Sequence, residues 1–291
     1  MFEGIYTAVV TPFDANVKVD FDSLIKILKY QSESEITGVV ILGSTAEEKS
    51  LTLSEKIKII KCAIKYVKNK EIIVGISCAN LNEAIKTLKI YDKYQIHGYL
   101  LGTPYYVKPT QRGLFEYFSK IAAMTQKDIC LYTVPSRTGC SILPKTVAKL
   151  SQIKNIIALK DATGDVDYAK NVLNTAKNGF KVLCGNDNLF LDYLKLGASG
   201  CISVVSNVFP NLLVNIQNNF VQNVEKSSRM FKKYSNFIDC LSLESNPIVI
   251  KYVLSKFKFC SSVMRLPLTE IENSNKILVD SNLKLLITEK K

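Results

Sequence analysis

Short hydrophobic runs recur along the chain, separated by longer stretches in which apolar residues return every three or four positions. Nearly continuous runs of this length are typical of strands buried on both faces, and the longer spacing is typical of amphipathic helices. The strand-like runs begin near residues 7, 39, 72, 98, 129, 157, 181 and 200. Eight strands that alternate with helices predict an α/β fold, a (β/α)8 TIM barrel.

The helix after the second run has the clearest start signal. Ile57, Ile60 and Ile64 fall on one helical face. Just before them, residues 52–55 read Thr-Leu-Ser-Glu, a capping box whose threonine and glutamate satisfy backbone N–H groups at a helix start. Residues 80–83 resemble a second box and predict the start of the next helix.

After about residue 208 the strand signals stop, and apolar residues continue only at helical spacing. Asn246 and Pro247 fit the cap and first residue of a helix that runs to Phe257, and a final helix is predicted over residues 274–286. We therefore expect a C-terminal helical appendage. The predicted division is a catalytic barrel over residues 1–224 and a helical domain over residues 225–291.

The 291-residue chain carries a formal net charge of +12, which could indicate a nucleic acid or an anionic membrane as partner. The basic residues are lysines spread along helical faces, except for arginines at 112, 137, 229 and 265. No arginine-rich arm or platform of interleaved aromatic residues accompanies them. No apolar stretch is long enough to cross a membrane. We expect neither a nucleic-acid nor a membrane partner.

Histidine and cysteine usage argues against several kinds of site. The single histidine, His97, precedes a predicted strand, so a histidine-cluster metal site or a histidine-based triad is not expected. The eight cysteines form no C-x-x-C pair, which disfavours a zinc site and a disulfide framework. Residues 1–5 lack a basic segment, so we expect no signal peptide and a reducing, cytoplasmic location.

Lys160 is the residue that most clearly indicates chemistry. It follows the apolar run of residues 156–159, which brings it to a place where an ammonium is hard to solvate. Desolvation favours the neutral amine, a nucleophile that forms Schiff bases with carbonyl compounds. Alternatively, the aliphatic stem covers the strand end while the ammonium reaches water. The strand by itself leaves both interpretations open.

The ends of the predicted strands add further polar groups to the same rim of the barrel, where the chemistry of such barrels lies. Each segment alone also fits a helix cap or a group of core aromatic residues. Together they favour an active site with a lysine nucleophile, hydroxyls, phenols and one guanidinium. The segments are residues 43–47, 103–106 and 132–139, Lys160, and residues 185–187.

Four of these segments resemble the signatures of the dihydrodipicolinate synthase and N-acetylneuraminate lyase family. They read Gly-Ser-Thr-Ala-Glu (43–47), Thr-Pro-Tyr-Tyr (103–106), Tyr-Thr-Val-Pro-Ser-Arg-Thr-Gly (132–139) and Leu-Lys-Asp-Ala-Thr-Gly (159–164). The resemblance extends over nearly the whole chain, through residues 244–247 and 265–269. Arg137, within Pro-Ser-Arg-Thr-Gly, favours the synthase branch over the lyases of sugar acids.

The resemblance implies a Schiff-base mechanism for Lys160. Its amine would condense with the ketone of pyruvate, and the resulting enamine would attack the aldehyde of L-aspartate 4-semialdehyde on the diaminopimelate route to lysine. Tyr132 would be the main proton carrier. Ser44 and Tyr106 would complete a hydroxyl relay, with Tyr106 supplied by a neighbouring subunit of a homotetramer built from two tight dimers.

The same resemblance implies the binding residues. Backbone amides of Ser44 and Thr45 would hold the carboxylate of pyruvate at a helix start. Arg137 would bind the carboxylate of the semialdehyde, and Gly185 and Ile202 would line the pocket. Neither a metal nor an organic cofactor is expected, because the lysine itself supplies the electrophilic catalysis.

Three positions depart from the usual pattern of the family. Ser44 stands where threonine is usual, so the hydroxyl is retained but the β-branch that stiffens the side chain is lost. Thr133 replaces an asparagine, which alters contacts around the catalytic tyrosine. Ala46 replaces a glycine, which we expect to strain the turn if that position requires a positive φ.

Regulation is a separate expectation, because some family members are inhibited by lysine bound at a subunit interface. Lys49 and Lys56 would repel the ammonium groups of bound lysine, so weak or absent feedback inhibition is predicted. The corresponding positions in this chain are Glu48, Lys49, Leu53, Lys56, Asn80, Glu83 and Tyr105.

Two other functions fit parts of the pattern. A family aldolase that cleaves N-acetylneuraminate or a 2-keto-3-deoxy sugar acid would keep Lys160 and Tyr132 but would not need Arg137. A catalytically silent scaffold or anion-binding barrel would explain the changes at Ser44, Ala46 and Thr133. The joint presence of the lysine, the phenols and the arginine argues against it.

Overall fold

The computed structural model describes residues 1–288 and contains a closed barrel of eight parallel strands, each hydrogen-bonded to its neighbours in chain order. The predicted (β/α)8 barrel is therefore confirmed. All eight predicted runs contribute a strand. The strands are β1 (Gly4–Ala8), β2 (Gly38–Ile41), β3 (Glu71–Ile76), β4 (Gly98–Gly102), β5 (Asp128–Thr133), β6 (Ile156–Asp161), β7 (Lys181–Cys184) and β8 (Gly200–Ser203).

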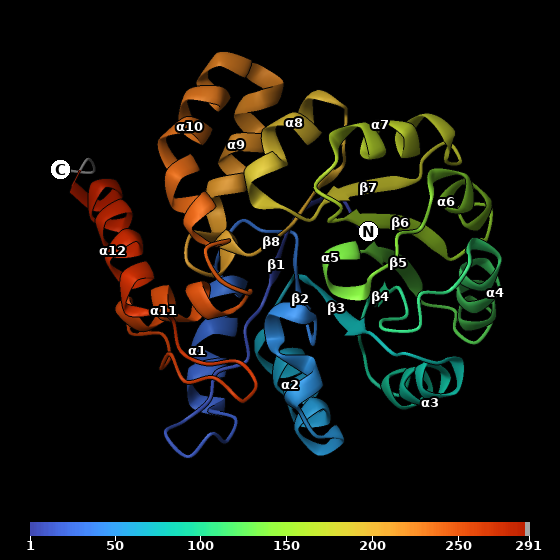
Figure 1. Cartoon of the computed structure of the whole chain (residues 1–291), viewed down its shortest axis with the longest axis horizontal. Helices are drawn as coiled ribbons and strands as arrows, with labels where there is room; N and C mark the ends of the chain where they lie inside the picture. The colour runs from blue at the N-terminus through green and yellow to red at the C-terminus, as the bar shows by residue number, and fades with distance from the viewer. Residues whose placement is uncertain (289–291) are drawn as a thin grey trace.

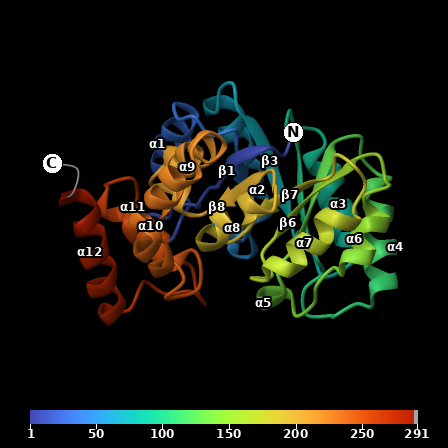
Figure 2. The same ribbon diagram turned by 90° about the horizontal axis from the view of Figure 1, so that it is seen from above.

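Helices surround the strands, and the C-terminal helices gather at one side of the barrel, opposite α4 and α6 (Figures 1 and 2). Apolar residues fill the layer between the strands and the surrounding helices. The helices are α1 (Phe21–Ser32), α2 (Leu53–Tyr66), α3 (Leu81–Tyr91), α4 (Gln111–Ala122), α5 (Pro135–Thr138), α6 (Pro144–Leu150), α7 (Val166–Thr175), α8 (Phe190–Lys195), α9 (Pro210–Gln222), α10 (Val224–Cys240), α11 (Ile248–Lys256) and α12 (Asn273–Thr288).

The first strand begins earlier than its apolar run predicts. The run starts at Thr7, whereas β1 starts at Gly4 and pairs there with Gly200 of β8. A β-carbon added at Gly200 would lie 1.9 Å from the carbonyl oxygen of Gly4. The barrel therefore closes through two glycines that bring the backbones together and interrupt the apolar signal.

The start of α2 agrees with the prediction, but its buried face does not. Thr52 and Glu55 form both hydrogen bonds of a capping box. The fully buried residues of the helix include Ile59, Ile60 and Ala63, whereas Ile57 and Ile64 are only partly buried. The spacing of apolar residues therefore predicted a buried helix face that is rotated slightly from the observed one.

The predicted cap of α11 is wrong. The helix begins at Ile248, Pro247 is its cap, and the Asn246–Pro247 peptide bond is cis. The Asn246 side chain does not cap the helix, because its Nδ2 donates a hydrogen bond to Oγ1 of Thr45, at 2.8 Å. The C-terminal segment thus contacts the loop after β2 directly.

The C-terminal helices pack on the barrel through α9 and α10, which lie side by side, and α12 packs on α10 (Figure 1). We propose that the catalytic barrel ends at about residue 224, between these two helices. None of the helices in residues 1–288 combines the length and the apolar character needed to cross a membrane.

Candidate active site

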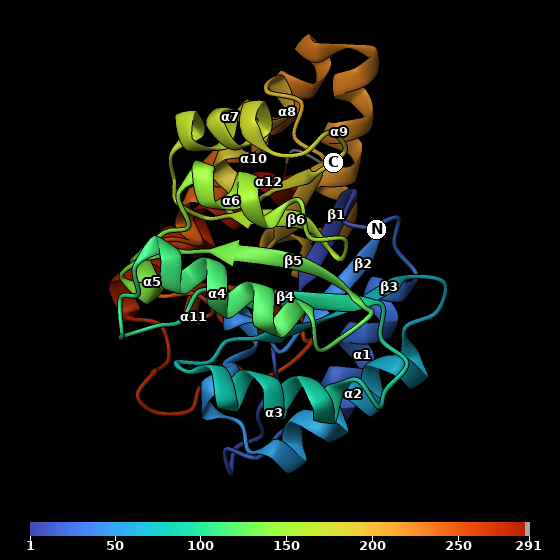
Figure 3. The same ribbon diagram turned by 90° about the vertical axis from the view of Figure 1, so that its right-hand side faces the viewer.

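The C-terminal ends of the strands lie at the opposite end of the barrel from the N-terminus of the chain, as the direction of β5 shows (Figure 3). Strands β5 and β6 place Tyr132 and Lys160 opposite each other in register at this end. Lys160 is 5% exposed, and its Nζ lies 4.7 Å from the centre of the Tyr132 ring. The nucleophile and the proton carrier that the sequence predicted are therefore neighbours.

The polar ends of these side chains have no partner inside the protein. Within the described residues, Lys160 Nζ, the Tyr132 hydroxyl and the Ser44 hydroxyl form no hydrogen bond or ion pair. A buried amine without a carboxylate partner is free to react with a carbonyl group. This pattern separates Lys160 from a lysine that serves a structural ion pair.

The residue after Lys160 points the other way, because side chains alternate along a strand. Asp161 is fully buried and accepts hydrogen bonds from the Tyr193 hydroxyl, at 2.7 Å, and from Thr163. Burial raises the pKa of Asp161, although these hydrogen bonds oppose the shift. Asp161 therefore fixes the end of β6 and does not face Lys160.

The loop after β2 supplies the expected carboxylate-binding amides. Ser44, Thr45 and Ala46 form a 3₁₀ turn in which the Ala46 N–H binds the Gly43 carbonyl and the Glu47 N–H binds the Ser44 carbonyl. In the part of the chain that the structure describes, the N–H groups of Ser44 and Thr45 make no hydrogen bond. Two adjacent free N–H groups form a site for an anion.

The structure shows the surroundings of two of the departures from the family pattern, Ala46 and Thr133. Ala46 lies in the turn without a positive φ, so the expected strain at Ala46 is absent, and the left-handed residue is Glu47, with a φ of 52°. Thr133 is fully buried, and its hydroxyl accepts the Ile142 N–H at 3.3 Å. Both replacements are accommodated by the local backbone.

Asn246 is a site residue that sequence reasoning missed. Its side chain reaches Thr45, and its backbone carbonyl accepts a hydrogen bond from Nη2 of Arg137, at 2.8 Å. Its own Oδ1 is buried and has no partner within the described residues. The segment 244–247 resembled the family, but an Asn-Pro pair also fits a helix start, and that interpretation obscured its role.

A cavity of about 410 Å³ opens above Lys160 and collects most of the predicted residues. A second hollow of about 420 Å³ shares Ser44, Tyr132 and Arg137 with it and extends toward Glu48 and Tyr105. Space for a small keto acid therefore lies over the lysine, and the second hollow adjoins it. The first cavity is lined, among others, by Ser44, Thr45, Tyr132, Arg137, Lys160, Gly185, Asn186, Asp187 and Asn246.

Two predicted residues are not part of this cavity. Tyr106 has a φ of 73°, is 89% exposed and does not line the cavity above the Lys160 of its own chain. Ile202 is fully buried among the apolar side chains inside the barrel, beneath the rim. Ile202 therefore belongs to the packed floor of the barrel, and Tyr106 is available to a second chain.

Three of the seven residues predicted for regulation, Glu48, Lys49 and Tyr105, line the second hollow. Glu48 pairs with Lys56, at 2.6 Å, and with Lys49, at 3.3 Å, and Lys49 lies 4.8 Å from the centre of the Tyr105 ring. Burial lowers the pKa of Lys49, but the Glu48 carboxylate beside it acts in the opposite direction, and the pKa is raised overall. Asn80 caps α3 by accepting the Glu83 N–H. Leu53, 46% exposed, is the first residue of α2.

Across residues 1–288, no three His, Cys, Asp or Glu side chains gather closely enough to hold a metal ion. The buried carboxylate of Asp187 accepts hydrogen bonds from the Val204 and Val205 N–H groups, at 2.9 and 2.7 Å. Burial raises the pKa of Asp187, and these amides oppose the shift. The Asp187 carboxylate therefore joins the segments that follow β7 and β8.

Comparison with known proteins gives a consistent result. Residues 1–286 match the model of the dihydrodipicolinate synthetase family. The 4-hydroxy-tetrahydrodipicolinate synthase of Thermosipho africanus is 39% identical over 290 residues, which cover 98% of each chain.

Solved structures extend the similarity to the fold. The 4-hydroxy-tetrahydrodipicolinate synthase of Methylacidiphilum fumariolicum SolV has a TM-score of 0.96 and 32% identity, covering 99% of this chain and 97% of its own. A structure described as the first monomeric dihydrodipicolinate synthase variant has a TM-score of 0.95 and 33% identity, covering 98% and 97%.

Proposed function

The chain belongs to the dihydrodipicolinate synthetase family, and on that premise we propose that it condenses pyruvate with L-aspartate 4-semialdehyde as a 4-hydroxy-tetrahydrodipicolinate synthase. It is a lyase-type enzyme of this family. The observation that carries the proposal is Lys160, buried at the floor of a cavity, beside Tyr132 and without a carboxylate partner in the described residues. The product would enter the diaminopimelate route to lysine.

Lys160 begins the reaction as a nucleophile. Its Nζ attacks the ketone carbon of pyruvate, water leaves, and a protonated imine forms. The imine withdraws electrons, so the methyl carbon loses a proton and an enamine results. The former methyl carbon of pyruvate, now the nucleophilic carbon of the enamine, attacks the aldehyde of the second substrate. The amino group of the second substrate then displaces Nζ from the imine carbon, which closes the ring and frees the lysine.

Proton transfer falls to the phenol of Tyr132. It lies over the lysine and has no internal partner among the described residues, so it can donate to and accept from the reacting groups in turn. Ser44 lines the same cavity and passes protons toward Tyr132. Tyr106 extends the relay from a second chain, because it is exposed and does not line the cavity of its own chain.

Binding uses the charges of the rim. The free N–H groups of Ser44 and Thr45 hold the carboxylate of the pyruvate imine. Arg137, anchored to the Asn246 carbonyl, presents its remaining N–H groups to the carboxylate of the semialdehyde. Gly185 borders the pocket, and Ile202 supports it from below.

A homotetramer built from two dimers would bring Tyr106 into a neighbouring active site. The exposed phenol on a left-handed backbone supports this assembly. A monomeric variant exists among the structural relatives. Sedimentation would measure the number of chains in the assembly. Tyr106→Phe should lower the rate if a neighbouring chain completes the site. We also place the enzyme in the cytoplasm, where its eight free cysteines would stay reduced.

Feedback by lysine should be weak or absent. The ammonium groups of Lys49 and Lys56 already neutralise Glu48 and would repel a bound lysine. Activity measured with rising lysine should stay constant. Half-inhibition at submillimolar lysine would overturn this part of the proposal.

The decisive assay follows pyruvate consumption after addition of L-aspartate 4-semialdehyde. Wild-type protein should consume pyruvate, and Lys160→Ala should lose the activity by a factor of about 10³ or more while remaining folded. Borohydride should trap pyruvate on the wild type and leave the variant unlabelled. Folded wild-type protein that consumes no pyruvate would contradict the proposal.

A further inference from the structure

A buried ion pair lies directly behind the turn that holds Ser44 and Thr45. Glu47 ends this turn in a left-handed conformation, and its side chain is 2% exposed. Its Oε1 lies 2.8 Å from Nζ of Lys251, which comes from α11 and is fully buried. The two residues are 204 positions apart in the sequence, so the pair links the C-terminal segment to the active-site loop.

The surroundings fix both partners. Lys251 Nζ also donates to the Val263 carbonyl, at 2.6 Å, and lies 4.3 Å from the centre of the Phe13 ring. The other oxygen of Glu47 accepts the backbone N–H of Arg265, at 3.3 Å. Burial lowers the pKa of Lys251, and the carboxylate of Glu47 opposes this shift. The carboxylate of Glu47 therefore helps to keep the buried amine of Lys251 charged.

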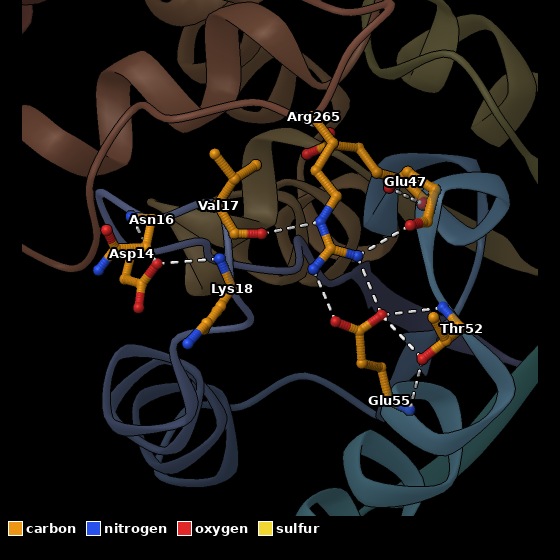
Figure 4. A network of polar contacts seen from close by, with 9 residues as sticks. Asp14, Asn16, Val17, Lys18, Glu47, Thr52, Glu55 and Arg265 are labelled. Atoms are coloured by element: carbon orange, nitrogen blue, oxygen red, sulfur yellow. Dashed lines mark hydrogen bonds and ion pairs between the residues drawn. The ribbon is translucent and has the colours of Figure 1, made fainter.

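The guanidinium of Arg265 holds a second, more exposed pair nearby (Figure 4). It binds both carboxylate oxygens of Glu55, at 2.9 and 2.6 Å, and donates to the Val17 carbonyl, at 3.0 Å. Glu55 belongs to α2 and caps that helix through Thr52, whereas Glu47 belongs to the turn itself. The two carboxylates therefore share an anchor but differ in what they position.

Backbone hydrogen bonds carry the position of Glu47 into the turn. Its N–H binds the Ser44 carbonyl, at 3.1 Å, and its carbonyl accepts the N–H of Ser50, at 2.9 Å. The direction of the free N–H groups of Ser44 and Thr45 therefore depends on where Glu47 is held. Stability alone does not require such a pair, since well-packed apolar side chains often replace a buried ion pair without loss.

We propose that Glu47 and Lys251 are positioning residues that fix the Ser44–Ala46 turn for the carboxylate of pyruvate. This inference rests on the proposed function and extends it, because it assigns pyruvate affinity to two residues that do not line the cavity above Lys160. Asn246, from the same C-terminal segment, holds Thr45 at a second point. The C-terminal segment thus sets the geometry of the binding turn from behind.

The test compares Glu47→Gln and Lys251→Met with the wild type. Each variant should raise the pyruvate KM about tenfold or more, change kcat less than threefold and leave the KM for the semialdehyde unchanged. The double variant should have a pyruvate KM no higher than that of the more impaired single variant, because its two neutral side chains leave no unpaired charge. If a single variant fails to fold, the pyruvate KM can still be measured on the double variant.

Glu55→Gln is the matched control. It weakens the ion pair between Glu55 and the guanidinium of Arg265, so it should lower the melting temperature while the pyruvate KM stays at the wild-type value. If Glu47→Gln and the double variant also melt earlier with an unchanged pyruvate KM, the pair is structural only and the inference is overturned.

A readout without the second substrate separates the two proposals. The pyruvate concentration that gives half-maximal borohydride trapping on Lys160 should rise in Glu47→Gln and stay unchanged in Glu55→Gln. Wild-type protein that traps pyruvate but does not consume it with the semialdehyde would contradict the proposed function and leave this comparison valid. Equal trapping curves for the wild type and Glu47→Gln would overturn the inference alone.

Discussion

The two ends of the barrel use their polar residues in opposite ways. At the N-terminal end, the Tyr6 hydroxyl accepts the Phe2 N–H, at 2.8 Å, and donates to Glu71 Oε2, at 2.5 Å. At the C-terminal end, the Lys160 amine lies beside the Tyr132 ring, and neither the amine nor the phenol hydroxyl has a hydrogen-bond partner in residues 1–288. Polar groups that satisfy one another stabilise a fold, whereas groups left open are available to a substrate.

The contrast extends to the electrostatics of the N-terminal end. Burial, together with the Glu71 carboxylate, raises the pKa of Tyr6, so its phenol remains a protonated donor. His97 is also used structurally, because its Nδ1 accepts the Ile72 N–H, at 3.0 Å. Substitutions at this end should therefore change stability, and substitutions at the other end should change rate or affinity.

Arg137→Ala should give the largest effect among the substitutions that sharpen this contrast. The guanidinium is exposed at the rim, and its one internal hydrogen bond in the described residues goes to the Asn246 carbonyl. Its loss removes a charge-assisted contact to the semialdehyde carboxylate, so kcat/KM for that substrate should fall by about 10²-fold or more. Steady-state kinetics with both substrates varied measures this effect.

Arg112→Ala provides the control for Arg137. Arg112 is an exposed arginine on α4 that pairs with Glu116, at 2.9 Å, and its removal should leave the kinetics unchanged. Borohydride trapping of pyruvate should also remain intact in Arg137→Ala. Full activity of Arg137→Ala would instead favour an aldolase that acts on sugar acids.

Tyr6→Phe tests the N-terminal end. The substitution leaves the Phe2 N–H and the Glu71 carboxylate without the phenol, so the free energy of unfolding should fall by about 1–3 kcal/mol. The kinetic constants of the folded enzyme should not change. Urea denaturation and steady-state assays of the same preparation measure both quantities.

Tyr132→Phe is the matching substitution at the other end. It removes a phenol that has no internal partner in the described part of the chain, so stability should stay within about 0.5 kcal/mol while kcat falls strongly. A loss of rate in Tyr6→Phe, or a loss of stability without loss of rate in Tyr132→Phe, would break the division between the two ends.

Sequence patterns predicted the features that depend on neighbouring residues. Buried strands and the capping box of α2 repeat over short distances, so their signals are local. The start of β1 was misplaced because Gly4 serves barrel closure, which depends on a strand far along the chain. The residues themselves indicated a lysine nucleophile at Lys160, whereas family resemblance added pyruvate as its substrate and the expected role of Arg137.

Contacts between distant segments could not be predicted in the same way. Asn246 reaches Thr45 across 201 positions, and no local pattern of Glu47 indicates that Lys251 will lie beside it. The residues that shape the binding turn from behind are therefore visible only in the folded chain. Ser44 is the opposite case, because its departure from the usual threonine is evident in the sequence but its effect depends on how firmly the turn is held.

Ser44→Thr should give the smallest effect, in the direction of improvement. The β-branch restricts the rotation of the side chain and should keep the hydroxyl closer to its working orientation beside Tyr132. Ser44 is only partly buried and borders a cavity, so the added methyl group has room. We expect kcat to rise about two- to fivefold in steady-state assays, with an unchanged pyruvate KM. Ser44→Ala, which removes the hydroxyl, should lower kcat well below both. If Ser44→Thr leaves kcat unchanged while Ser44→Ala lowers it, the turn anchored by Glu47 already orients the serine, and preorganisation at this end of the barrel comes from the backbone and not from the side chain.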